Sequence, residues 1–135
     1  MRIDPSSEAG AFLLSQGATE DELKAANFRV LNAQFGDALT VVWPGGSATI
    51  YVKGWFLQPD ESGNLPVNRA LALLRHELHH VRQGREWGFL GYWSRHLWAR
   101  VRHLSIAAKS SSVEAPAYEI QRAAYAALAE MGVTS

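Results

Sequence analysis

Hydrophobic and polar positions change their spacing along the chain, and the changes separate helical stretches from strand-like ones. Residues 6 to 16 and 19 to 27 have the pattern of two short helices. The second opens with Thr19 and, three positions later, Glu22, which is the spacing of a capping box. From residue 28 onwards β-branched and aromatic residues predominate. We therefore predict strands over residues 28 to 31, 38 to 43 and 48 to 57.

The last two strands are separated by a short segment that is typical of a hairpin turn. Its sequence is Pro44-Gly45-Gly46-Ser47, and glycine readily adopts the positive φ that such turns require. We therefore expect the strands to form a small antiparallel sheet. A polar loop, residues 58 to 64, follows this sheet.

Three helical stretches account for the rest of the chain. The first begins at Pro66 and is expected to end near Gln83, because Gly84 is a common helix stop. The second covers residues 86 to 108, in which apolar residues recur on one helical face at positions 93, 97, 101, 104 and 108. The third runs from about residue 113 to residue 131. A small sheet followed by helices predicts an α+β fold.

Size and composition limit the class of protein. The chain has 135 residues, of which 47% are hydrophobic and 19% charged, as expected for a single domain over residues 1 to 135. It contains no cysteine, so any bound metal must be held by nitrogen and oxygen atoms. No apolar run is long enough for a signal peptide or a membrane span. We therefore expect a soluble, cytoplasmic protein.

The charges balance overall but are unevenly distributed. Thirteen basic and thirteen acidic residues give a net charge of zero, which argues against a nucleic-acid partner. Residues 1 to 37 are acidic, whereas residues 82 to 109 carry six basic residues against Glu86 alone. The basic stretch is also aromatic, with Trp87, Phe89, Tyr92, Trp93 and Trp98. We expect these aromatic side chains to complete the core rather than to line a substrate groove or contact a membrane.

The central helix contains the motif H-E-x-x-H at residues 76 to 80. At 100° per residue, His80 lies 40° from His76, so both imidazoles project from one side and can share a metal ion. Glu77 lies between them. The apolar residues Leu71, Leu74, Leu78 and Val81 form a stripe on the opposite side. The helix can thus pack through one face and present the histidine pair on the other; the alternative is a solvated histidine face on an ordinary amphipathic helix.

A catalytic zinc ion has three protein ligands, so the histidine pair needs a third. Glu86, Glu114 and Glu119 could each provide it. Glu86 follows His80 by six residues, close to the spacing of the third ligand in one group of zinc proteases. Glu119 is expected to be a solvated helix residue. We favour Glu114, because it lies in the first turn of the last helix. The small side chain of Ala117, three positions later, would let that helix approach the histidine helix.

These motifs together resemble a known group of proteins. Residues 76 to 83, HELHHVRQ, resemble the HE-x-x-HV-x-Q helix of small bacterial gluzincin-type zinc metallopeptidase domains. Residues 114 to 118, EAPAY, resemble the downstream E-x-x-A-Y element of the same group, and the resemblance covers about residues 48 to 125. It implies a zincin-like fold with zinc bound by His76, His80 and Glu114, and with Glu77 as the general base.

We therefore expect a zinc-dependent hydrolase that acts on a peptide or protein substrate. A second donor to the developing oxyanion could be Tyr118, His79 or an arginine among residues 95 to 102. An extended substrate could pair with a sheet edge, for which the strand at 48 to 57 is the first choice. The alternative is a non-catalytic binding or assembly module with a structural metal. The substrate, the oligomeric state and the need for a partner are not determined by the sequence.

Overall fold

The computed structural model describes residues 1–32, 37–54, 56, 58–107 and 113–133. Its elements follow in the order α1 (Glu8–Ser15), α2 (Glu20–Ala25), β1 (Ala26–Val30), β2 (Ala38–Val42), β3 (Ala48–Val52), α3 (Ala70–Ala107) and α4 (Ala115–Glu130). The fold is therefore α+β, with a small three-stranded sheet followed by helices, as predicted. Positions 55, 57 and 108, which the predicted strand and helix include, lie outside the described residues.

The first two helices begin at side-chain caps, of which the sequence predicted the second. The Ser7 side chain accepts a hydrogen bond from the backbone of Gly10 at the start of α1. At the start of α2, Thr19 and Glu22 form the predicted capping box, in which each side chain binds the backbone of the other residue. These caps satisfy donors that a helix leaves unpaired at its beginning, so both short helices are fixed locally.

The sheet has the strand order β1-β3-β2 and is mixed, so the prediction of an antiparallel sheet is wrong for β1. β2 and β3 form the expected antiparallel hairpin, with Gly45 at φ 91° in the turn. β1 instead runs parallel to β3 and pairs Phe28 with Ile50. Both side chains are buried, and this pairing joins the apolar positions of β1 to those of the central strand. It also leaves β2 at an edge of the sheet.

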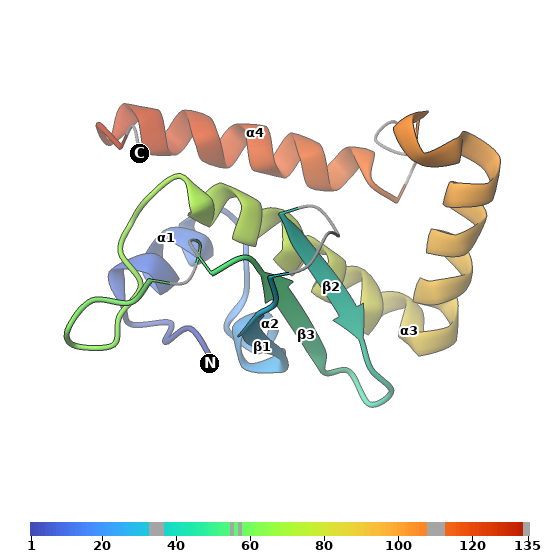
Figure 1. The fold of residues 1–135 in the computed structure, drawn as a ribbon, viewed down its shortest axis with the longest axis horizontal. Coiled ribbons are helices and arrows are strands. Elements are labelled where there is room, and N and C mark those ends of the chain that lie inside the picture. Colours follow the sequence, from blue (N-terminus) through green and yellow to red (C-terminus); the bar gives the residue numbers. More distant parts are fainter. Residues whose placement is uncertain (33–36, 55, 57, 108–112, 134–135) are drawn as a thin grey trace.

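α3 is a single helix of 38 residues in place of the two that we predicted. Gly84 does not end it, because glycine serves here for close packing: a Cβ atom at Gly84 would lie 2.7 Å from Cγ1 of Val42 on β2. The helix instead changes direction near Gly88, whose φ of 74° interrupts the regular helical geometry. Figure 1 shows the second part of α3 rising at one end of the molecule toward the start of α4.

One apolar core joins the sheet, the first part of α3 and the remaining helices. Its largest fully buried apolar side chains are Leu13, Leu23, Phe28, Ile50, Leu71, Leu74, Leu78 and Leu128. The predicted stripe opposite the histidines is therefore confirmed as the core face of α3. α4 packs along α3, and the small Ala117 and Ala124 are fully buried on α4 (Figure 1). No helix in the described part of the chain is both long and apolar enough to cross a membrane.

The aromatic second part of α3 does not complete the core as we expected. Tyr92 is buried, but Leu90, Leu97 and Trp98 have exposed fractions of 79%, 67% and 63%. The prediction failed because the bend near Gly88 carries this part of the helix away from the sheet. Only its inner face then packs against the rest of the molecule.

Candidate metal centre

Two buried histidines project from the first part of α3, as the helical spacing predicted. The ring centroids of His76 and His80 are 5.1 Å apart, and both residues are at most 5% exposed. They come one turn apart on the helix face that lies opposite the core stripe. Their burial contradicts the alternative of a solvated histidine face, so these rings need partners within the protein.

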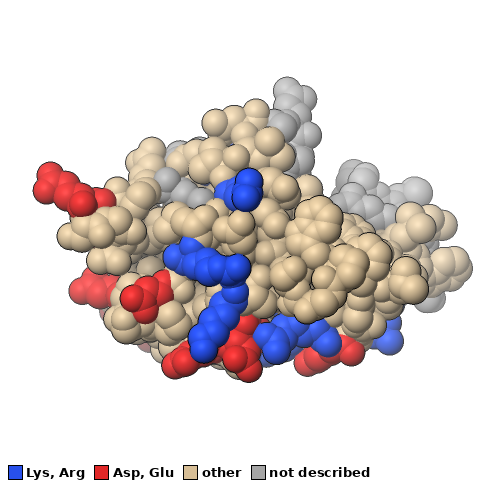
Figure 2. Space-filling model, turned by 90° about the horizontal axis from the view of Figure 1, so that it is seen from below, with Lys and Arg blue, Asp and Glu red and all other residues tan. Residues whose placement is uncertain are grey.

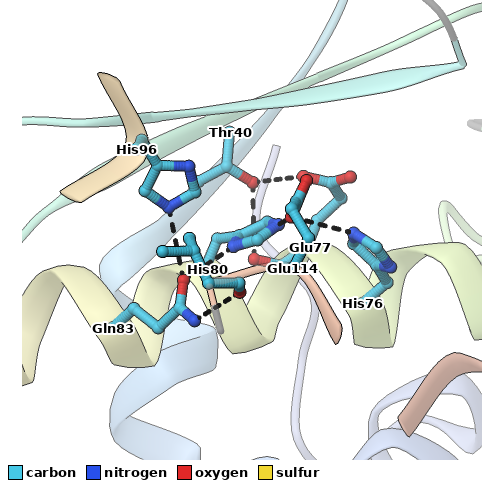
Figure 3. Close-up of polar contacts among 8 residues, drawn as sticks. Thr40, His76, Glu77, His80, Gln83, His96 and Glu114 are labelled. Atoms are coloured by element: carbon cyan, nitrogen blue, oxygen red, sulfur yellow. Dashed lines mark hydrogen bonds and ion pairs between the residues drawn. The ribbon is translucent and has the colours of Figure 1, made fainter. Parts of the chain in front are cut away.

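Glu114 reaches the histidine pair from the start of α4. It is the N-cap residue of this helix, and Pro116 occupies the first turn that follows. Glu114 Oε1 lies 2.7 Å from His80 Nε2 and 3.9 Å from His76 Nε2 (Figure 3). α4 packs on α3 and Ala117 is fully buried, so the glutamate at the start of α4 lies beside the histidines.

The three side chains form a group that could hold a metal ion. One ligand atom from each of His76, His80 and Glu114 lies within 4.8 Å of the others. Zinc–nitrogen and zinc–oxygen bonds are about 2 Å long, so the ligand atoms of one ion lie within about 4 Å of each other. The group is slightly wider than such a site, and its donor set of two imidazoles and one carboxylate suits zinc. The other two candidate glutamates, Glu86 and Glu119, are exposed and do not belong to this group.

At pH 7 two of the three residues, His76 and Glu114, are already in the protonation state that metal binding requires. Burial and the charge of His80 lower the pKa of His76 to about 4, so this imidazole is neutral at pH 7. Burial alone would raise the pKa of Glu114, but the hydrogen bond to His80 and the histidine charges lower it to about 2. For His80, burial opposes protonation, yet the hydrogen bond to Glu114 and the charges of Glu77 and Glu114 raise its pKa. His80 therefore has to lose a proton before it can bind a metal.

Gln83 connects the two helices that carry the group. Its Nε2 donates to the carbonyl of Val113 at 2.8 Å, which identifies Oε1 as the atom that faces His80 Nδ1, also at 2.8 Å. Because a carbonyl oxygen only accepts, Nδ1 of His80 carries a proton, and Nε2 is the atom directed toward Glu114. Gln83 is 3% exposed. Its two hydrogen bonds hold the ring of His80 close to the backbone of Val113, which comes directly before Glu114. Gln83 belongs to the HV-x-Q pattern, but the sequence did not indicate that it connects the two helices.

Glu77 lies beside the group without belonging to it. Thr40 on β2 donates a hydrogen bond from Oγ1 to Glu77 Oε2 at 2.5 Å (Figure 3). Both residues are at most 5% exposed. Burial raises the pKa of Glu77, while the charge of His80 and the hydrogen bond from Thr40 act in the opposite direction. A carboxylate with a raised pKa is suited to accept a proton. Sequence reasoning missed Thr40, because strand residues could not be aligned with the helix before the fold was known.

The group opens into a cavity of about 610 Å³. Tyr118 lines it and packs edge-on against His76, with 4.6 Å between ring centroids. His96, which we did not anticipate, lines it from the second part of α3 and lies 3.3 Å from Gln83 Oε1. Tyr92 and His96 are four residues apart on one helical face, but only the bend near Gly88 turns that face toward the cavity. Neither His79 nor Arg95 lines the cavity, and the guanidinium of Arg95 lies over the ring of Trp87.

Comparison with protein-family models, with curated proteins and with solved structures gave no match. The resemblance to gluzincin-type domains therefore rests on the sequence motifs alone. What the geometry described above establishes is an α+β fold in which two histidines and a downstream glutamate form a group able to hold a metal ion.

Proposed function

We propose that this chain is a zinc-dependent peptidase. The observation that carries the proposal is the convergence of two buried histidines and Glu114 from separate helices, with the buried carboxylate of Glu77 beside them in an open cavity. A structural metal site is usually closed by a fourth protein ligand, whereas a catalytic site keeps one position open. Three ligands next to a cavity are the arrangement expected of a catalytic site.

In this proposal His76, His80 and Glu114 hold the zinc ion. A bound zinc ion would supply a Lewis acid, which acidifies water and polarises a substrate carbonyl. Gln83 keeps His80 in the tautomer that offers Nε2, through the proton on Nδ1. The lowered pKa of Glu114 keeps its carboxylate ionised over the whole neutral range.

Glu77 is the general base. Thr40 binds Oε2 of this carboxylate and holds it at the cavity wall, which leaves Oε1 to accept a proton from water. The raised pKa of Glu77 strengthens it as a base, and the same oxygen can then return the proton to the leaving amine. Tyr118 lines the cavity beside His76 and is the best-placed of our predicted donors to the oxyanion.

The substrate in this proposal is an extended peptide that binds along β2. The strand that we first chose for this role, residues 48 to 57, contains β3, which is paired on both sides and offers no edge. β2 is an edge strand, and residues 37 to 40 at its beginning line the cavity. An edge strand provides backbone donors and acceptors for a peptide of any sequence. A peptide paired there would run past Glu77.

A second candidate is a non-catalytic module in which a metal fastens α4 to α3. The direct contact of 2.7 Å between His80 and Glu114 favours it, because this pair already links the two helices. The two candidates differ in their need for Glu77. A structural metal requires only its ligands, whereas hydrolysis also requires the base.

Glu77→Gln tests the proposed function. This variant keeps the shape of the side chain and removes the base, so it should bind zinc normally and lose about 10²- to 10⁴-fold in turnover. Glu119→Gln on the exposed side of α4 is the matched control and should retain full activity. The assay would use a mixed-sequence peptide library with products read by mass spectrometry. Equal cleavage by wild type and Glu77→Gln would refute catalysis at this site, and zinc binding without any cleavage would favour the structural module.

A further inference from the structure

The second part of α3 presents an apolar face to solvent. Its most exposed side chains are Leu90, Leu97, Trp98 and Val101, with exposed fractions of 79%, 67%, 63% and 62%. At 100° per residue, Leu90, Leu97 and Val101 lie within 40° of each other. Tyr92 and Ala99 on the opposite face are buried. The helix is thus apolar on both sides, and we call its exposed side, formed by residues 90, 97, 98 and 101, the outer apolar face.

Further aromatic side chains border the outer apolar face. Trp93 is 36% exposed, and its ring nitrogen donates to the carbonyl of Val42 at 3.0 Å, which fixes the ring at the end of β2. Trp43, the next residue after Val42, is 44% exposed. Single exposed apolar residues are common on proteins, but neighbouring large ones on a single element are typical of an interaction site.

The charge of this segment is uniformly basic. From Trp87 to Val113 the sequence contains Arg95, Arg100, Arg102 and Lys109 and no aspartate or glutamate. The guanidinium of Arg95 lies 4.3 Å above the ring of Trp87, on the flank of the helix. Figure 2 shows that the described surface at this end of the molecule, on the right, is mostly without charged side chains, and that basic and acidic side chains lie together along its lower edge. A partner of this segment must therefore offer both an apolar layer and negative charge.

We infer that the outer apolar face binds the surface of a bilayer that contains anionic lipids. Acyl chains can take up Leu90, Leu97 and Val101, while lipid phosphates attract the basic residues that the sequence of this segment contains. Tryptophan is also favoured at the boundary between lipid headgroups and acyl chains. A second copy of the chain would place two basic segments against each other, and a nucleic acid would offer phosphates but no apolar layer. The lipid surface is the partner that satisfies both requirements.

This binding mode would lay the second part of α3 along the membrane surface rather than across it. Trp93 and Leu97 also line the cavity beside the metal group, so the proposed contact with the bilayer lies next to this cavity. The inference is independent of the proposed hydrolysis, because none of these residues belongs to the metal group. Treatment with EDTA should leave lipid binding unchanged even if it abolishes activity.

Vesicle flotation with the full chain tests the inference. Wild type should float with vesicles of phosphatidylglycerol and phosphatidylcholine in equal amounts and bind pure phosphatidylcholine at least about tenfold more weakly. The variant Leu97→Gln/Trp98→Gln should bind the anionic vesicles at least about tenfold more weakly than wild type, because two large apolar side chains are lost from the contact. The matched control is Leu31→Gln, which changes an exposed leucine beyond the end of β1 and should bind like wild type.

The substituted side chains are exposed, so all variants should fold like wild type. Circular dichroism would check this. Equal binding of the double variant and wild type, or no binding of wild type to anionic vesicles, would overturn the inference. So would a wild-type dimer in solution that the double variant abolishes, because a second copy would then cover the outer apolar face. A shift of tryptophan fluorescence to shorter wavelength on adding anionic vesicles, reduced in the double variant, would support it independently.

Discussion

Glu114 Oε1 lies 2.7 Å from His80 Nε2, although His80 belongs to α3 and Glu114 comes directly before α4. A buried ionic contact is stabilising only when other hydrogen bonds support its members, because both groups have lost water. Gln83 provides this support from the other side of the imidazole and also binds the backbone of Val113. One short network therefore holds the two helices at the point where a metal ion would bind.

We predict that the protein binds about one zinc ion per chain through His76, His80 and Glu114. Glu114→Ala should reduce the zinc content after dialysis to a small fraction of the wild-type value, because it removes the ligand that reaches the histidines from the start of α4. Glu119→Ala, an exposed position on the same helix, should leave the zinc content unchanged. Elemental analysis of the purified proteins measures both. Full zinc content in Glu114→Ala would show that another residue completes the site.

Zinc should also raise the thermal stability of the protein, because the ligands come together only in the folded chain. At a free zinc concentration 100 times the dissociation constant, the stabilisation is about 2.7 kcal/mol, or roughly 10 °C in Tm for a domain of this size. EDTA should reverse the shift in wild type and have no effect on Glu114→Ala. Differential scanning calorimetry gives both values, and an unchanged wild-type Tm would exclude a metal that joins α3 to α4.

The parts of the site that depend on helical spacing could be predicted from the sequence. The positions of His76 and His80 on one side of a helix follow from its 3.6-residue period, and so does the buried stripe through Leu71 and Leu78. Glu114 could be proposed because a small residue, Ala117, follows it by one turn. The capping box of α2 and the hairpin turn are also local patterns. In each case a few neighbouring residues decide the outcome.

The parts that depend on distant contacts could not be predicted. Gly84 looks like a helix stop in the sequence, but Val42 packs where its side chain would be, and the helix continues. The direction of β1 is decided by pairing with β3, and residues near β1 contain no signal for it. Thr40 and His96 reach the site only because β2 lies against α3 and because α3 bends near Gly88. The spacing of residues along the chain gives no information on contacts between residues that are far apart in the sequence.

Removing the side chain of Gln83 should weaken metal binding without unfolding the protein. Gln83→Ala leaves the His80 ring without its partner at Nδ1 and frees the backbone before Glu114. Loss of a hydrogen bond behind a ligating histidine typically lowers metal affinity by about 10- to 100-fold. Competition with a chromophoric zinc chelator would measure the change, with Gln58→Ala in an exposed loop as the control. Equal affinities in both variants would mean that Gln83 has no influence on the ligands.

The metal-free protein should lose part of its stability as the pH falls from about 7 to about 4, and His79 should contribute to the loss. Burial, together with the charge of His80, lowers the pKa of His79 to about 4 in the folded state, against 6.5 for an exposed histidine. The unfolded chain therefore binds the proton first, so this contribution is complete above pH 6.5 and is lost as the pH falls toward 4. His79→Gln should reduce the pH-dependent loss by on the order of 1 kcal/mol, a value that allows for solvent screening of this half-buried imidazole. Urea unfolding at pH 7 and pH 4.5 compares the two proteins.

Thr40 should control the reactivity of Glu77, because its hydroxyl is the hydrogen-bond donor to the carboxylate at 2.5 Å. Thr40→Val has nearly the same shape and lacks the donor, so the carboxylate loses a contact that both fixes its position and lowers its pKa. If Glu77 is the general base of a peptidase, we expect kcat/KM to fall by about tenfold or more, with zinc content unchanged. The acidic limb of the pH profile should also move to higher pH, because the base then remains protonated over a wider range. Thr40→Ser restores the donor and should restore both the rate and the profile. A Thr40→Val enzyme with the wild-type rate and pH profile would show that this hydrogen bond serves only the packing of β2 on α3.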